Sequence, residues 1–117
     1  MKVMVYPEKL KGKIRAVPSK SMAHRLLICA AMSEGVTRVR CNTSSEDIDA
    51  TVSCLKAMGS NIVRIGNTYL VPKVTVHAGQ SVEFDCNESG TTLRFMMCVA
   101  AGLGLCVRFL VGTDYAF

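Results

Sequence analysis

The chain contains no tryptophan and only two histidines, and aromatic residues make up 6% of its 117 positions. Proteins bind single-stranded nucleic acid largely by stacking bases on aromatic side chains, so this scarcity argues against a nucleic-acid binder. His24 and His77 have no cysteine at the spacing of a zinc site. No apolar run approaches the length of a membrane span, and the opening MKVMVYPEKLKGK lacks the apolar core of a signal peptide. We therefore expect a folded protein without a metal site or a membrane segment.

The six cysteines include no Cys-x-x-Cys pair. Cys29, Cys98 and Cys106 lie inside apolar runs, where buried free thiols are common. A disulfide framework requires an oxidising compartment, whereas free thiols persist in the reducing cytosol. Free thiols in a cytoplasmic protein are the better interpretation, and a disulfide-stabilised secreted chain is the alternative.

The balance of residue types predicts one folded domain of modest size. Half of the residues are hydrophobic and 20% are charged. The formal net charge of +5 indicates an anionic partner, which is a phosphorylated metabolite, a nucleic acid or a membrane surface. Only the stretch KLKGKIR supports nucleic acid locally, and its lysines fit a solvated strand face. Nucleic acid is therefore not the expected partner.

The first helix is marked by its flanking residues. Pro18 disfavours helical backbone at the residue before it, and Ser19 is a favourable N-cap. The helix is expected from about Lys20 to Ser33, and Gly35 stops it.

Two further helices follow. Ser44 and Asp47 resemble a capping box at the start of the second helix, which Gly59 closes. The third helix is expected over 90–101, ending at the Gly102/Gly104 pair.

The segments between the helices read as short strands. A hairpin is expected over 61–71, turning at Gly66 and Asn67. The other segments expected to be extended are 1–7, 13–18, 36–40, 74–76, 82–85 and 105–111. Alternating helices and strands predict an α/β or α+β fold with helices packed on short mixed-sheet strands.

The start of the first helix carries an unusual set of polar residues. On a helical wheel Lys20, Ser21, His24 and Arg25 fall within an arc of roughly 140°. The other side holds apolar residues, so the helix is expected to be largely buried; they are Met22, Ala23, Leu26, Leu27, Cys29 and Ala30.

Basic residues are electrostatically disfavoured at this end, because the amino end of a helix is the positive end of its dipole. A bound anion would reverse that repulsion, with Ser21 donating a hydroxyl, Lys20 an ammonium and Arg25 a guanidinium fork. The alternative is a solvated helix end with incidental basic residues. His24 by itself fits a structural or surface residue better than an acid–base catalyst.

The start of the third helix carries a similar set of residues: a small residue, hydroxyls and a nearby arginine. Gly90 permits close backbone approach or an unusual dihedral angle, Thr91 and Thr92 supply hydroxyls, and Arg94 lies on the first turn. Two such starts predict a ligand with more than one anionic group. The carboxylate of Glu88 would repel an anionic ligand at this helix start unless it pairs with a basic residue.

These segments also resemble a known family. PSKSMAHRLLICAAMSEG, SSEDIDATVSCLKAMG and ESGTTLRF are similar, in order and spacing, to signatures of the 5-enolpyruvylshikimate-3-phosphate (EPSP) synthase family. The resemblance covers about residues 2–112. It implies a transferase of the shikimate pathway, hence of aromatic amino acid biosynthesis, that adds the 5-hydroxyl of shikimate 3-phosphate to C2 of phosphoenolpyruvate and then releases phosphate. It also implies a fold of repeated βαβαββ units in two lobes.

The resemblance further implies roles for individual residues. Lys20 is expected to be catalytic and to touch both substrates, while Ser21 and Arg25 hold shikimate 3-phosphate. Gly90 and Thr91 are expected at phosphoenolpyruvate. Arg94 is expected to organise its loop. The family requires no metal or organic cofactor.

Two features depart from the family pattern. Glu88 stands where asparagine is more common, and Tyr115 lies near the expected place of a phosphoenolpyruvate-binding arginine. Family enzymes are also several times longer, so residues 1–117 are expected to form a single partial domain, the N-terminal portion of a two-lobed enzyme. The isolated chain is then expected to be catalytically incomplete. The alternative function is a non-catalytic fragment that binds phosphometabolites, and self-association or pairing with a complementary fragment is expected.

Overall fold

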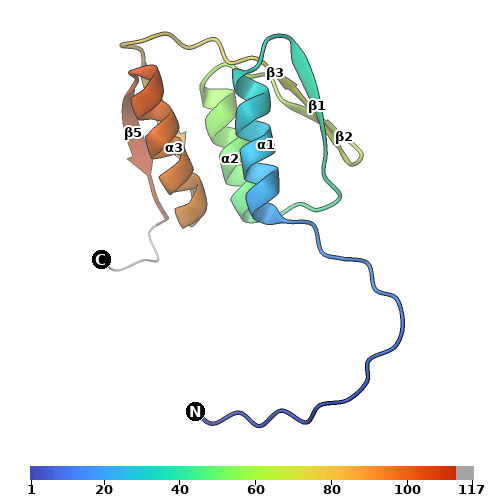
Figure 1. Ribbon diagram of the computed structural model, residues 1–117. Coiled ribbons are helices and arrows are strands. Elements are labelled where there is room, and N and C mark those ends of the chain that lie inside the picture. Colours follow the sequence, from blue (N-terminus) through green and yellow to red (C-terminus); the bar gives the residue numbers. More distant parts are fainter. Residues whose placement is uncertain (113–117) are drawn as a thin grey trace.

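The computed structural model describes residues 1–112, which form three adjacent helices and two small sheets (Figure 1). The helices are α1 (Lys20–Met32), α2 (Glu46–Ala57) and α3 (Gly90–Leu103). The strands are β1 (Val36–Arg40), β2 (Val63–Ile65), β3 (Thr68–Pro72), β4 (Ser81–Asp85) and β5 (Cys106–Leu110). This arrangement confirms the expected mixed α/β class with three helices and short strands.

The two sheets differ in strand direction. The first is antiparallel in the order β1-β3-β2, and β2 and β3 form the expected hairpin with Gly66 in the turn at φ +58°. The second pairs β4 with β5 in parallel. A parallel pair needs a long crossover connection, and α3 supplies it. The start of α3 therefore follows directly from the end of β4.

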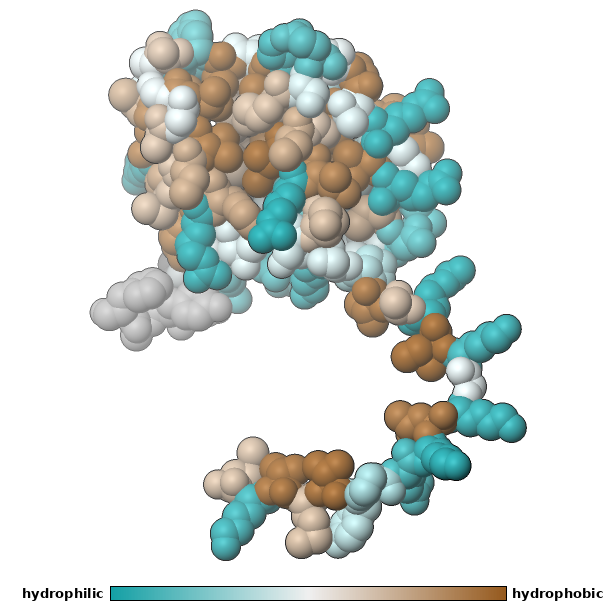
Figure 2. Space-filling view, in the orientation of Figure 1, coloured by the Kyte–Doolittle hydropathy of each residue, from teal (hydrophilic) through white to brown (hydrophobic). Residues whose placement is uncertain are grey.

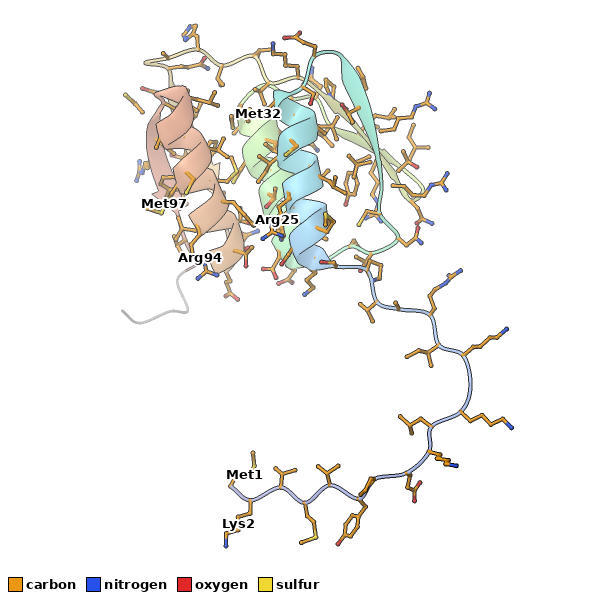
Figure 3. The ribbon with its side chains drawn as sticks, in the orientation of Figure 1. Met1, Lys2, Arg25, Met32, Arg94 and Met97 are labelled. Atoms are coloured by element: carbon orange, nitrogen blue, oxygen red, sulfur yellow. The ribbon has the colours of Figure 1, made fainter. Side chains whose placement is uncertain are left out.

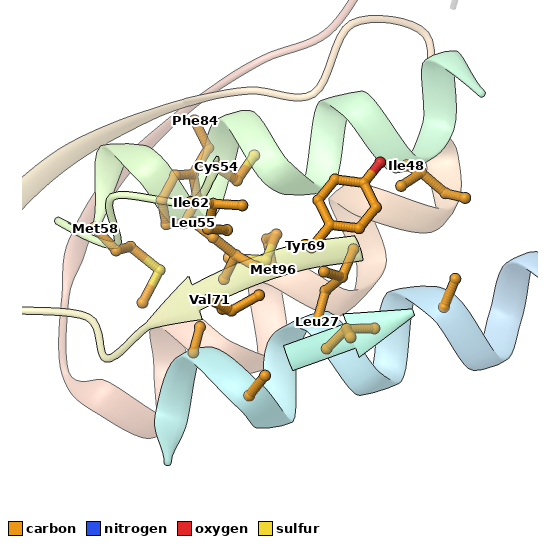
Figure 4. Close-up of a cluster of buried hydrophobic side chains, with 14 of the residues drawn as sticks. Leu27, Ile48, Cys54, Leu55, Met58, Ile62, Tyr69, Val71, Phe84 and Met96 are labelled. Atoms are coloured by element: carbon orange, nitrogen blue, oxygen red, sulfur yellow. The ribbon is translucent and has the colours of Figure 1, made fainter. Parts of the chain in front are cut away.

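The hydrophobic core surrounds α2 (Figure 4). Ile48 and Leu55 of α2 are fully buried, as are Leu27 of α1, Met96 of α3 and Phe84 of β4. Each large side chain removed from water in this way contributes on the order of 1.5–3 kcal/mol. Because α1 and α3 both pack on α2, that helix sets their relative position.

Several boundaries differ from those expected from the sequence. The N-cap of α2 is Ser45, whose Oγ accepts a hydrogen bond from the Ile48 N–H, so the assignment of the cap to Ser44 is wrong. Helix α3 continues through Gly102 and ends at Leu103, and its C-cap Gly104 has the left-handed conformation.

The strand expected over 74–76 does not form. The Val74 N–H donates to the carbonyl of Ala31, and the Thr75 N–H donates to the carbonyl of Met58. These donors satisfy the carboxyl ends of α1 and α2 instead of pairing with another strand.

Helix α1 is less buried than its composition suggests. Met22 and Leu26 are 52% and 47% exposed, and Cys29 is also exposed. Its buried face is the one that meets α2, β1 and β3. That face consists of Ala23, His24, Leu27, Ala30 and Ala31.

Residues 1–19 precede α1 as an extended arm that is exposed along its whole length. Apolar and basic side chains are interspersed along it (Figure 2). The two segments expected to be extended, 1–7 and 13–18, lie here, and neither pairs with a strand within the described chain.

The corrected cap gives a direct test of the start of α2. Replacing Ser45 with alanine is expected to lower the free energy of unfolding by about 1 kcal/mol, because the Ile48 N–H loses its acceptor. Ser44→Ala is the matched control and should change it by less than about 0.5 kcal/mol, because Ser44 is exposed. Urea denaturation measures both. Equal losses from the two variants would contradict the assignment.

Candidate functional site

The amino ends of the helices meet at one end of the molecule. Lys20 Nζ of α1 lies 3.9 Å from Asp47 Oδ2 of α2. The Arg25 guanidinium lies 6.0 Å from the centroid of the Phe95 ring, on the first turns of α3. Figure 3 shows Arg25 and Arg94 at this shared end. The two helix starts singled out in the sequence are therefore brought together.

The three starts differ in charge. The first turn of α2 contains Glu46, Asp47 and Asp49, so carboxylates offset the positive end of its dipole. The first turns of α1 and α3 contain no acidic residue. The positive ends of α1 and α3 are thus the ones available to an external anion.

Serine caps leave the outermost backbone donors of α1 and α3 open. Ser19 Oγ accepts from the Met22 N–H at 3.2 Å, and Ser89 Oγ accepts from the Thr92 N–H at 3.0 Å. The N–H groups of the first two residues of a helix have no acceptor within it. In these helices they belong to Lys20 and Ser21, and to Gly90 and Thr91.

The side chains expected to bind substrate are accessible to solvent. Lys20, Ser21, Arg25 and Gly90 are exposed, and Thr91 is partly exposed. Apart from its chain neighbours and the backbone of its own helix turn, no atom of residues 1–112 lies within 4 Å of the position that a Cβ would take on Gly90, so ligand atoms have room to reach its backbone. Its φ is not in the left-handed region, so the suggestion of an unusual dihedral angle there is wrong.

Asp47 is a member of this surface that sequence reasoning did not assign. Its carboxylate pairs with Lys20, and the two side chains are 42% and 59% exposed. An exposed pair of this kind contributes about 0–1 kcal/mol, so a phosphate group can replace the carboxylate at little expense.

A buried chain of hydrogen bonds links the three helices behind this surface. His24 Nδ1 of α1 lies 2.7 Å from Thr51 Oγ1 of α2, which lies 2.8 Å from Thr92 Oγ1 of α3. Ser89 Oγ donates to Thr92 Oγ1 at 2.8 Å, and Thr92 Oγ1 donates to the Asp47 carbonyl at 3.1 Å. His24, Thr51, Ser89 and Thr92 are all buried.

His24 is therefore a structural residue within the helix interface, as the sequence favoured. Burial lowers the pKa of its imidazole below the usual value; the nearby Asp47 carboxylate opposes that change and Lys20 reinforces it. Thr51 was not identified from the sequence, although it offered one signal. It is a polar residue three positions after Ile48, on the face of α2 that is otherwise apolar.

The neighbouring acidic residues form a separate feature. Glu46, Asp49, Asn87, Glu88 and Gly112 line a cavity of about 500 Å³. Three carboxylates do not favour an anion, so the cavity is not part of the anion surface. Tyr115 and the place of the missing arginine lie in 113–117, outside the described residues.

Other kinds of site receive no support in residues 1–112. The described chain contains no group of three or more His, Cys, Asp or Glu residues arranged to hold a metal ion. None of the helices described is long and apolar enough to cross a membrane. All six cysteines are free thiols. Cys54 and Cys86 lie with their sulfur atoms 4.0 Å apart, and burial raises the pKa of both thiols.

Residues 5–116 match the protein family described as EPSP synthase (3-phosphoshikimate 1-carboxyvinyltransferase). The chain belongs to the EPSP synthase family. The 3-phosphoshikimate 1-carboxyvinyltransferase of Clostridium kluyveri is 40% identical over 116 residues, which cover 92% of this chain and 25% of that protein. The Clostridium perfringens (strain 13 / Type A) protein of the same name is 40% identical over 100 residues, which cover 85% of this chain and 24% of the relative.

The structural comparison agrees with the family. EPSP synthase from Acinetobacter baumannii superposes with a TM-score of 0.58 at 25% identity, covering 73% of this chain and 20% of that structure. The chain thus spans about a quarter of the length of these EPSP synthase relatives.

The buried His24 predicts a pH-dependent stability. Its folded pKa lies below the unfolded value of about 6.5, so the unfolded chain binds protons more readily. Its contribution is therefore complete above about pH 6.5 and is lost as the pH falls towards the lowered folded pKa. Urea denaturation between about pH 8 and pH 5 measures this loss.

Matched variants assign that loss to one histidine. His24→Asn should flatten the pH dependence of stability, whereas His77→Asn should leave it unchanged because His77 is exposed. The assignment fails if His24→Asn retains the wild-type pH profile.

Proposed function

We propose that this chain is part of a cytoplasmic enzyme that transfers the enolpyruvyl group of phosphoenolpyruvate to the 5-hydroxyl of shikimate 3-phosphate. Membership of the EPSP synthase family supports the reaction class. The observation that carries the proposal for this chain is the pair of helix starts without acidic residues, held at one end of the molecule beside Lys20 and Arg25. Both substrates are anions, and this surface is suited to anions.

Each residue of the surface has a distinct task in this proposal. Ser21 and Arg25 hold shikimate 3-phosphate through a hydroxyl and a guanidinium fork. The backbone of Gly90 and the hydroxyl of Thr91 hold phosphoenolpyruvate at the amino end of α3. Lys20 contacts both substrates and stabilises the charge that develops as the C–O bond forms.

The reaction proceeds by addition and elimination. The 5-hydroxyl oxygen bonds to C2 of phosphoenolpyruvate as C3 gains a proton, and the hydroxyl loses its own proton. The tetrahedral intermediate then loses phosphate from C2 and a proton from C3, which restores the double bond. Lys20 leaves its exposed pair with Asp47 when the substrate anions arrive.

A second candidate function is a fragment that binds phosphometabolites without catalysing the transfer. The five proposed contact residues lie on an open surface, and no opposing wall faces them within residues 1–112. Excluding water and aligning the reacting groups require both walls of a site. The chain alone is therefore expected to bind substrate without turnover.

Binding is tested by titrating the chain with shikimate 3-phosphate and following backbone amides by NMR. The Ser21 and Arg25 amides should shift in a saturable way. Arg25→Gln should weaken binding by about tenfold, equivalent to about 1.4 kcal/mol, because a guanidinium–phosphate contact is lost. Arg38→Gln on β1 removes the same charge elsewhere and should change affinity by less than about twofold. The absence of any shift at millimolar ligand contradicts the proposed site.

A phosphate-release assay with both substrates separates the two functions. The isolated chain is expected to release no phosphate above background, because it presents one wall of the site. Saturable release that disappears in Lys20→Ala would instead show that these residues suffice for catalysis.

A further inference from the structure

The buried hydrogen-bond chain has only one consistent arrangement of protons. Thr92 has a single hydroxyl proton, which it donates to the Asp47 carbonyl because a carbonyl only accepts. Thr51 must then be the donor in its contact with Thr92. With its own proton used, Thr51 accepts from His24, so Nδ1 of His24 carries a hydrogen.

This arrangement gives every hydroxyl of the hydrogen-bond network a partner. Thr92 Oγ1 donates once and accepts from Ser89 and Thr51. Thr51 Oγ1 accepts once and donates once. Fully satisfied buried networks fix relative geometry, whereas a partly satisfied network destabilises the fold. Protonation of Nε2 of His24 leaves the donors and acceptors of these hydrogen bonds unchanged, because Nδ1 is already a donor.

The two ends of the hydrogen-bond network lie next to the proposed substrate contacts. His24 lies immediately before Arg25 and one turn after Ser21 on α1. Ser89 and Thr92 lie on either side of Gly90 and Thr91. Lengthening or breaking this row of hydrogen bonds would therefore change the spacing between the starts of α1 and α3.

We propose that His24, Thr51 and Thr92 are positioning residues that hold the start of α1 against the start of α3, with His24 as the Nδ1–H tautomer. This inference rests on the proposed function in one respect: phosphoenolpyruvate contacts both Lys20 and Gly90, so its affinity depends on their spacing. Within residues 1–112, the proposed contacts to shikimate 3-phosphate all lie on α1, so its affinity for this chain should not depend on that spacing.

The tautomer is tested without any ligand. Long-range ¹H–¹⁵N NMR of the folded chain at pH 8 distinguishes a protonated from an unprotonated ring nitrogen. His24 should show a hydrogen on Nδ1 and a bare Nε2, while the exposed His77 serves as an internal reference. A hydrogen on Nε2 with a bare Nδ1 would mean that His24 accepts from Thr51, which overturns the proposed order of donors and acceptors.

The positioning role is tested by two matched variants. Thr51→Val removes the hydroxyl while preserving shape, and Thr51→Ser keeps the hydroxyl. Thr51→Val should weaken phosphoenolpyruvate binding by about tenfold and shikimate 3-phosphate binding by less than about twofold. Thr51→Ser should leave both affinities within about twofold of wild type. Equal weakening of both ligands by Thr51→Val overturns the positioning role.

The same variants separate this inference from the proposed function. If the wild-type chain binds neither ligand, the proposed function fails. The positioning role is then tested by comparing the backbone amide shifts of the variants with those of the wild type in the absence of ligand. Thr51→Val should then shift the Ser21 and Gly90 amides on both sides of α2, whereas Thr51→Ser should not. An effect confined to α2 overturns the inference. If Thr51→Val does not fold, the tautomer measurement and retention of the wild-type spectrum by Thr51→Ser decide it.

Discussion

The amino-terminal half of α2 is the constraint on which the other features depend. Ile48 anchors it in the core, and Thr51 reaches towards both flanking helices. The Asp47 carbonyl accepts from α3, while the Asp47 side chain pairs with Lys20 of α1. One turn of α2 therefore contacts the starts of both other helices and holds them in position relative to each other. A surface assembled from α1 and α3 cannot form correctly unless this turn is in place.

The electrostatic design follows from that placement. Three helix dipoles point their positive ends in one direction, which is unfavourable unless negative charge is nearby. Helix α2 supplies that charge from its own first turn, whereas α1 and α3 do not. The remaining positive potential is reinforced by Lys20 and Arg25. Basic residues at a helix end where they are otherwise disfavoured are consistent with the proposal that this surface binds an anion.

Local signals were enough to predict most of the fold. Ser19 marked the start of α1 correctly, and Gly66 with Asn67 marked the hairpin, because caps and turns depend on neighbouring residues. Gly35 did not mark the end of α1, which stops at Met32 with Ser33 as its C-cap. The assignment of the α2 cap to Ser44 was wrong by one residue, because the adjacent Ser45 offers the same capping chemistry. The segment 74–76 failed as a strand because its backbone donors are used by helix ends distant in sequence.

The site was predictable only where it was local. Lys20, Ser21, Arg25, Gly90 and Thr91 were recognised from two helix starts, and the structure brings those starts together. Their functional roles remain predictions. The contribution of α2 was missed because its contacts join residues 27 and 41 positions apart. Nothing in the spacing of such residues indicates that they meet.

Ser89 shows how closely folding and binding are joined at this end. Its single oxygen caps α3 by accepting from the Thr92 N–H, and its proton goes to Thr92 Oγ1. The residue that starts the helix thus also closes the polar chain beside Gly90. Alanine at this position would remove both contacts at once, so one substitution would weaken the cap of α3 and open the polar network beside the proposed phosphoenolpyruvate site.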